Sequence, residues 1–223
     1  MSLLERLEIK HPIFLAPMAG VSTPALAAEV SNQGGLGSLG LGASSISAAR
    51  AQILATQALT DAPFQVNFFC HRSEKLDPEI TAQWLNYLVP QFEHFNEPVP
   101  EKLECIYPSF LDHDDFLNLV LETRPKAVSF HFGIPHAHQI AALKAAGILT
   151  MVSATNLPEA QAIEAAGIDM IIAQGIEAGG HRGMFNQHID SAIKTSDLVQ
   201  LLSKNCGIPI IAAGGIMKGQ QAR

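Results

Sequence analysis

The sequence predicts an α/β fold in which parallel strands alternate with helices to form a (β/α) barrel. Short apolar runs bounded by Gly, Pro or Asn alternate with longer amphipathic segments along the whole 223-residue chain, which is typical of a parallel sheet. In addition, 48% of the residues are hydrophobic and only 16% are charged, the balance of a buried sheet covered by helices. A chain of this length can bury one core, so we expect a single domain over residues 1–223.

Seven segments have the length and composition of buried strands. In chain order, the expected strands are 12–19, 36–41, 64–69, 127–132, 148–154, 170–174 and 208–213. The segments between them have the length that a parallel crossover requires. The expected helices are 23–33, 45–59, 77–95, 113–123, 137–146, 157–166 and 196–204. Segment 97–112 contains three prolines and no clear periodicity, so we expect a surface excursion there.

The number of strands bears on the architecture. An eight-fold barrel requires one further strand with its helix, whereas this sequence ends at 220–223, where the seventh helix would begin. A seven-stranded open sheet would leave its apolar first strand unpaired. We therefore expect a TIM-type (β/α)8 barrel that is truncated after about the seventh strand. A doubly wound sheet is the alternative, but residues 16–20 do not match the G-x-G-x-x-G loop that usually follows its first strand.

Composition also limits the class of partner. The net charge of −7 and the lack of any Lys/Arg cluster argue against a nucleic-acid partner, so a small-molecule ligand is expected. No stretch reaches the ~18 uninterrupted apolar residues of a membrane span. Cys70, Cys105 and Cys206 follow no metal-finger or redox spacing. Buried or idle thiols fit a reducing cytoplasm, where we expect the protein. The sequence does not predict an oligomeric state.

The loop after the sixth expected strand has the most chemical content. Residues 177–183 read Glu-Ala-Gly-Gly-His-Arg-Gly, and in parallel barrels the active site lies at the carboxyl ends of the strands. A histidine at that edge titrates near neutral pH and can serve as a base or a hydrogen-bond donor. His181 is therefore the candidate catalytic residue. The alternative is a histidine that only holds the loop by hydrogen bonds.

Other strand ends carry candidate ligand contacts. Gly214 and Gly215 follow the last strand, where backbone N–H groups can bind a phosphate, although a plain strand-to-helix turn explains them equally well. Asn67 and Gln174 are amides at apolar strand ends and need hydrogen-bond partners. Either a ring with carbonyl and N–H edges or the neighbouring loops would supply them. Ser153 lacks the glycine-flanked elbow of a hydrolase nucleophile.

Three histidines in the spacing H-x4-H-x-H suggest a metal site at first sight: His131, His136 and His138. Gly133 and Pro135 break any helix between the first two, and no carboxylate follows nearby. We therefore expect no metal. Segment 129–135 is expected to shape the wall opposite the ligand, with His131 as a secondary polar candidate.

Together, these segments resemble the nitronate monooxygenases, formerly called 2-nitropropane dioxygenases, which are FMN-dependent barrels. The resemblance spans nearly the whole chain and rests on segments 12–20, 33–37, 63–68, 128–135, 153–156, 173–183 and 208–215. The pair formed by segments 129–135 and 173–183 is far more specific than either glycine turn alone.

The resemblance implies a flavin-binding barrel with FMN as cofactor. It implies that a nitronate or nitroalkane reacts with O₂ to give a carbonyl compound and nitrite. His181 would be the catalytic histidine, which removes the α-proton of a nitroalkane. The positions that would contact FMN are Met18, Asn67, Gln174, Gly179, Gly180, Gly214 and Gly215. His131 and Ser153 are candidates for the substrate pocket.

Two other functions remain open. The family's eighth strand supplies a Gln-x-Gly-Thr turn to the phosphate site, and no segment of this sequence matches it. A non-catalytic flavin or ligand binder is therefore one alternative. The flavin-dependent enoyl-acyl-carrier-protein reductases, which use NAD(P)H, are the other, because their Gly-Gly-His loop is similar. The tripeptide His131-Phe132-Gly133 favours the monooxygenase.

Overall fold

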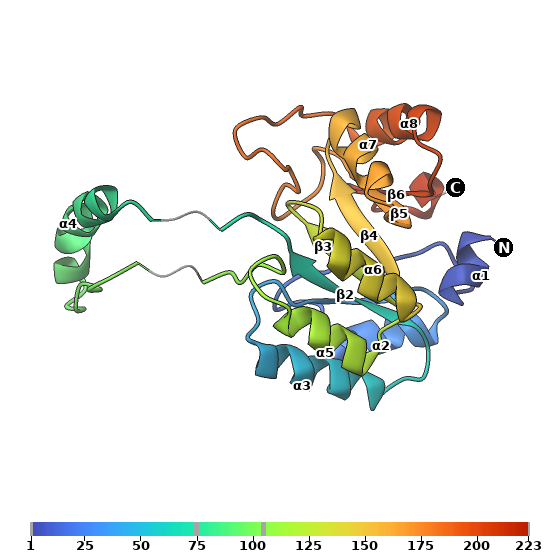
Figure 1. Ribbon diagram of the computed structural model, residues 1–223, viewed down its shortest axis with the longest axis horizontal. Helices are drawn as coiled ribbons and strands as arrows, with labels where there is room; N and C mark the ends of the chain where they lie inside the picture. Colours follow the sequence, from blue (N-terminus) through green and yellow to red (C-terminus); the bar gives the residue numbers. More distant parts are fainter. Residues whose placement is uncertain (1, 74–75, 104–105, 223) are drawn as a thin grey trace.

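The computed structural model describes residues 2–73, 76–103 and 106–222. A parallel sheet of six strands in the order β1-β2-β3-β4-β5-β6 forms its centre. The strands are β1 (Gly37–Gly40), β2 (Phe64–Phe69), β3 (Ala127–His131), β4 (Leu149–Ala154), β5 (Met170–Gln174) and β6 (Ile210–Ala213). Figure 1 shows the sheet with helices packed around it. This architecture confirms the predicted α/β barrel class.

Six helices follow or join the strands in the predicted alternation. They are α2 (Pro24–Asn32), α3 (Ile46–Gln57), α5 (Asp115–Thr123), α6 (Ala137–Ala145), α7 (Leu157–Ala165) and α8 (Thr195–Asn205). Several begin where their sequence has a side-chain cap, since the Thr23 hydroxyl accepts from the N–H of Leu26 and the Asn156 amide oxygen accepts from the N–H of Glu159. A short 3₁₀ helix, η1 (Gly219–Ala222), follows β6.

The prediction of a first strand over residues 12–19 is wrong. It reduces to an isolated parallel bridge between Phe14 and Leu36. Leu15 donates to the Leu36 carbonyl and Leu36 donates to the Ile13 carbonyl, both at 2.9 Å. Pro17 lacks the N–H group that would extend this ladder beyond Leu15, and Ile13 is 57% exposed. The other six strands confirm the prediction.

The buried side chains form two clusters, and strands β3 to β6 contribute to both of them. Phe64, Val66 and Phe68 of β2 pack against the covering helices, whereas side chains of the opposite strand face form a second cluster with Leu7 and Met151. Leu7 belongs to α1 (Leu3–Leu7), a helix that the sequence did not predict. α1 packs on the amino ends of the strands.

An ion pair attaches α1 to the sheet. Arg6 contacts Asp169 at 2.5 Å, and the same carboxylate accepts hydrogen bonds from the N–H (3.0 Å) and the hydroxyl (2.8 Å) of Thr150. Within the sheet, the Ser38 hydroxyl and the Gln65 amide oxygen are buried without a hydrogen-bond partner among the described residues. Ser38 and Gln65 stand opposite each other in the register of β1 and β2.

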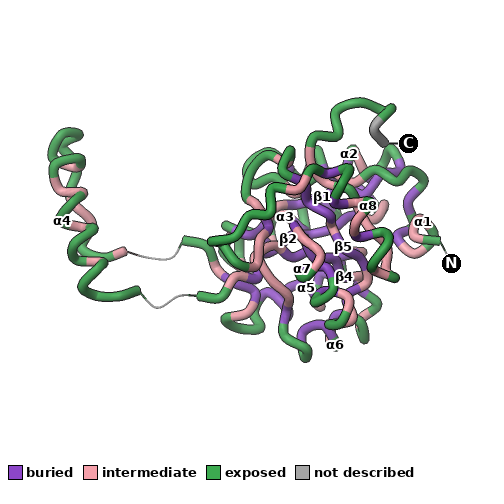
Figure 2. Tube along the Cα trace, turned by 90° about the horizontal axis from the view of Figure 1, so that it is seen from above, coloured by how far each residue is buried: buried purple, intermediate pink, exposed green. Residues whose placement is uncertain are grey.

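Helix α4 (Pro78–His94) was predicted as a helix, but not where it lies. We expected it to cover the sheet, whereas Figure 1 shows it standing away from the sheet and from the other helices. None of its residues is buried, and Figure 2 colours α4 as exposed or intermediate throughout. Trp84 is 51% exposed. α5 packs on the sheet instead, where Phe116 lies with its ring centroid 4.9 Å from that of Phe68 of β2. The surface excursion predicted for 97–112 therefore begins earlier and includes α4.

Candidate active site

The carboxyl ends of the strands bring the main candidates together. β2 ends near Asn67, β3 at His131, β4 near Ser153 and β5 at Gln174. Parallel pairing places Asn67 beside Ser129 of β3, and the Asn67 amide donates to the Ser129 hydroxyl at 2.9 Å. The loop that carries His181 lies over this edge.

Aromatic side chains surround the imidazole of His181. Phe69 and Phe132 lie with ring centroids 5.7 Å away, and Tyr107 lies 6.0 Å away, all edge-on. Among the described residues, no hydrogen bond or ion pair engages the ring nitrogens of His181, and the residue is exposed. The three aromatic rings thus contact the imidazole, while its nitrogens stay available to bind a ligand. The sequence did not single out Tyr107, which comes from the excursion after β2.

The backbone of His181 is held more tightly than its ring. Its carbonyl oxygen accepts hydrogen bonds from the amide of Gln174 at 2.9 Å and from Nε2 of His131 at 3.0 Å. Nδ1 of His131 lies 2.9 Å from the Ser153 hydroxyl. Because a carbonyl oxygen only accepts, Nε2 of His131 carries the proton and Nδ1 accepts from Ser153.

Burial keeps His131 neutral in this arrangement. Removal from water lowers the pKa of His131 from 6.5 to about 4, although the hydrogen bond to the His181 backbone opposes this shift. His131 and Ser153 were expected to line the substrate pocket. The structure places both side chains in a hydrogen-bond chain that ends on the backbone of the catalytic candidate.

The Gln174 amide is also committed to this loop. Its oxygen accepts from the Gly183 N–H at 2.7 Å and from Arg182 at 3.2 Å. Gly183 lies so close to β3 and β4 that a Cβ there would be 2.7 Å from Cε1 of His131 and 2.9 Å from Cβ of Ser153. The loop can therefore approach these strands only with glycine at position 183.

Glu177 and Thr195 join the loop to the turn after β6. The Glu177 carboxylate accepts from the N–H and the hydroxyl of Thr195, both at 2.8 Å, and these bonds lower the pKa of Glu177. The Thr195 hydroxyl also lies 3.0 Å from the Gly214 carbonyl oxygen. Gly214 and Gly215 have φ angles of 118° and 67°, which favour glycine. The sequence did not predict this role of Thr195.

The remaining candidates border the same edge. The Met18 N–H donates to the Ser22 hydroxyl at 2.8 Å, so this backbone donor is already engaged, while the Met18 side chain is partly exposed. Gly179 and Gly180 are exposed, and no atom lies within 4 Å of a Cβ placed at either position. The backbone at these two glycines is therefore open to a ligand.

No group of three or more His, Cys, Asp or Glu side chains within the described ranges could hold a metal ion. His138 instead contacts Asp114 at 3.1 Å, and the rings of His136 and His138 stack with centroids 5.8 Å apart. Asp114 precedes these histidines in the chain.

No described helix is long and apolar enough to cross a membrane. Cys70 and Cys206 are free thiols, whereas Cys105 lies outside the described residues.

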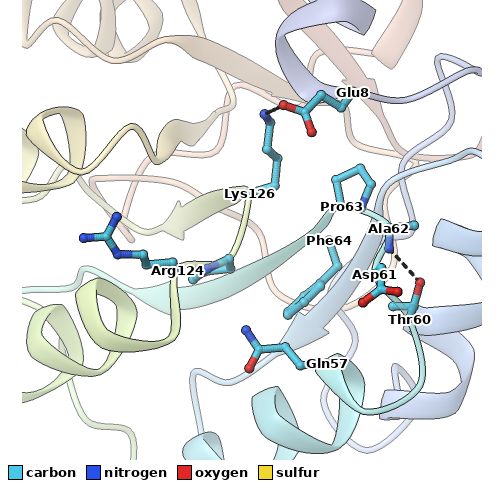
Figure 3. A pocket seen from close by; sticks show the side chains of 10 residues that line it. Glu8, Gln57, Thr60, Asp61, Ala62, Pro63, Phe64, Arg124 and Lys126 are labelled. Atoms are coloured by element: carbon cyan, nitrogen blue, oxygen red, sulfur yellow. Dashed lines mark hydrogen bonds and ion pairs between the residues drawn. The ribbon is translucent and has the colours of Figure 1, made fainter.

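A groove of about 400 Å³ lies at the opposite edge of the sheet. Figure 3 shows Phe64 at the start of β2, with Lys126 and Arg124 before β3, as part of its lining. Lys126 forms an ion pair with Glu8 beside it. Residues at the amino ends of barrel strands commonly serve stability rather than catalysis, so this groove is separate from the candidate site.

The fold and the rim define an α/β barrel that carries a glycine-rich, histidine-bearing loop at the carboxyl ends of its strands. A family model described as "Nitronate monooxygenase" matches residues 1–223, and the chain belongs to this family. The match confirms the resemblance seen in the sequence.

Individual relatives agree with this assignment. A nitronate monooxygenase from Paraburkholderia phytofirmans is 55% identical over 219 residues, covering 98% of this chain and 60% of the relative. The solved nitroalkane oxidase of Streptomyces ansochromogenes superposes with a TM-score of 0.87 at 38% identity, covering 99% of this chain and 63% of that one. The solved structure of a FabK mutant from Thermotoga maritima superposes with a TM-score of 0.72 at 31% identity, covering 98% of this chain and 58% of that one. The chain thus spans about 60% of the curated relative's length.

Proposed function

We propose that the protein, with FMN bound, oxidises alkyl nitronates and nitroalkanes with O₂ to carbonyl compounds and nitrite. One observation carries the proposal: the His181 imidazole stands at the carboxyl edge of the barrel, and no described residue forms a hydrogen bond or ion pair with its ring nitrogens. Two hydrogen bonds fix the His181 carbonyl oxygen. The names of the relatives point to the same chemistry.

FMN fits the residues present at this edge. The N–H groups of Gly214 and Gly215 form no hydrogen bond within the described chain, and backbone donors in a left-handed turn suit a phosphate. The open backbone at Gly179 and Gly180 allows a planar ring to approach closely. Met18, Asn67 and Gln174 stay proposed contacts of the ring. The bound flavin would supply the electron-transfer chemistry.

The chain itself would bind, orient and deprotonate the substrate. In its neutral form, His181 can take the α-proton of a nitroalkane on a ring nitrogen, which leaves the nitronate anion. Phe69, Tyr107 and Phe132 would limit the access of water to that ring. The hydrogen bonds to the His181 carbonyl oxygen would hold the backbone that carries the imidazole in place. A preformed nitronate would bypass the proton-transfer step.

The experiment compares nitrite release from a nitroalkane and from its preformed nitronate under O₂, alongside the visible flavin spectrum. We expect His181→Asn to keep the flavin band and to lose about 100-fold or more in kcat/KM on the nitroalkane, with a much smaller loss on the nitronate. His188→Asn, in the same exposed segment, is the matched control. Equal losses on the two substrates would mean that His181 is not the base.

The sequence leaves open a competing function, NADH-dependent reduction of an enoyl thioester, because of its Gly-Gly-His loop. The competing result would be rapid NADH-dependent reduction of crotonyl thioester with no nitrite from nitronate. Absence of a flavin band even after addition of FMN would favour the non-catalytic binder.

We also propose a cytoplasmic location, which the free thiols of Cys70 and Cys206 support.

A further inference from the structure

Arg182, which follows the catalytic candidate, donates five hydrogen bonds to other described residues. Nη1 donates to the Gln174 carbonyl (3.0 Å), the Gln174 amide oxygen (3.2 Å) and the Gly175 carbonyl (2.7 Å). Nε and Nη2 donate to the two oxygens of Asp190, each at 3.1 Å. The Arg182 side chain is only 14% exposed. One guanidinium therefore joins the end of β5 to residue 190 across the loop.

These contacts determine which way the Gln174 amide faces. Its oxygen accepts from both Arg182 and the Gly183 N–H, so its nitrogen points to the His181 carbonyl oxygen. A flipped amide would direct N–H groups at two donors and leave the His181 carbonyl facing an oxygen. Such a flip would lose three hydrogen bonds in a partly buried site.

The guanidinium of Arg182 is well suited to orient the Gln174 amide. A planar guanidinium serves a carboxylate on one edge and carbonyl oxygens on another in a fixed geometry, which a lysine ammonium cannot reproduce. Asp190 holds the guanidinium plane, and its pKa is lowered, chiefly by the Arg182 side chain and then by the Ala192 N–H. The ionised pair therefore persists at neutral pH.

We infer that Arg182 is a positioning residue: by fixing the Gln174 amide and the end of β5, it holds the His181 backbone so that the imidazole meets the substrate in one orientation. Its effect on turnover rests on the proposed function. Its effect on the loop does not, because the Gly183 N–H reports the state of the Gln174 amide directly.

The experiment uses Arg182→Gln and Asp190→Asn, with Arg50→Gln as control. Arg50 also forms a two-pronged pair with a carboxylate, Glu122, but on the exposed outer surface. Two quantities are measured: hydrogen exchange at the Gly183 amide, and kcat and KM on a nitroalkane and on its nitronate.

For Arg182→Gln we expect Gly183 exchange to accelerate more than about 10-fold. kcat on the nitroalkane should fall by about 10- to 100-fold, since small displacements of a catalytic group are costly, while KM stays within about 3-fold. The loss on the nitronate should be smaller. Asp190→Asn should shift both quantities less, in the same direction, and it keeps the test open if Arg182→Gln does not fold. Arg50→Gln should change neither.

Unchanged Gly183 exchange in both Arg182→Gln and Asp190→Asn would overturn the inference, as would equal losses on nitroalkane and nitronate. If the unmodified protein releases no nitrite from either substrate, the proposed function fails. The exchange measurement would still decide whether Arg182 holds the loop.

Discussion

Burial of the His131 imidazole makes stability depend on pH. The pKa of this ring falls from 6.5 to about 4 in the folded protein, mainly because burial removes it from water. Between these pH values the unfolded chain binds a proton at His131 and the folded chain does not. Stability is therefore complete above pH 6.5 and is lost progressively as the pH falls towards 4.

The magnitude follows from the two pKa values. Each pKa unit corresponds to about 1.36 kcal/mol, so the full shift would correspond to about 3 kcal/mol and the loss at pH 5 to about 2 kcal/mol. The ring is partly accessible to solvent, which reduces the figure. We expect about 1 to 2 kcal/mol less stability at pH 5 than at pH 7.5 from His131 alone.

Urea unfolding at pH 7.5 and pH 5, followed by far-UV circular dichroism, measures this loss. His131→Asn removes the titrating ring, so its loss between the two pH values should be smaller than that of the unmodified protein by about 1 to 2 kcal/mol. Carboxylates with lowered pKa values, such as Asp114 and Asp190, contribute alike to both proteins and cancel. His11→Asn, at an exposed position, should keep the original pH dependence. The reasoning is refuted if His131→Asn and the unmodified protein lose the same stability.

Three substitutions test packing and hydrogen bonding by the shift of the urea midpoint at pH 7.5. Gly183→Ala should lower the free energy of unfolding by about 1 to 3 kcal/mol, because its methyl group would overpack the site. Gly179→Ala, with no atom near its Cβ, should lower it much less. Similar losses for the two variants would contradict the close approach of the loop. Asp169→Asn should cost about 1 to 3 kcal/mol because it weakens the bond from Arg6, and no change would mean that this ion pair does not secure α1. Ser38→Ala removes a buried hydroxyl without a partner in the described chain, so stability should stay constant or rise by up to about 1 kcal/mol; a clear loss would reveal a hydrogen bond to the hydroxyl.

Local patterns account for the parts of the fold that the sequence predicted. β5 is an apolar run that ends at the polar Gln174, and it lies where expected. The segment 12–19 is equally apolar, but apolar content alone takes no account of Pro17, which has no N–H to continue a parallel ladder. α1 spans only five residues, too few for helical periodicity to be visible. For α4, periodicity predicts an apolar face but not what that face packs against.

The candidate site was predicted in its residues rather than in its contacts. His181 stands out because a histidine among glycines follows a strand, a local feature. Its contacts with His131 and Tyr107 join positions distant in sequence, and no spacing rule connects them. Arg182 lay within the noted loop, yet the five hydrogen bonds of its guanidinium depend on how the loop folds back on β5.

The position of α4 affects how the protein can be observed. Trp84 is the single tryptophan of the chain; it lies on α4 with its ring stacked on Tyr87 at 5.2 Å. Intrinsic tryptophan emission therefore reports on this outlying helix and not on the sheet. A fluorescence transition during unfolding would record changes around α4, while the barrel could still be intact. Emission that shifts on addition of a binding partner, with an unchanged circular dichroism spectrum, would report contact at α4.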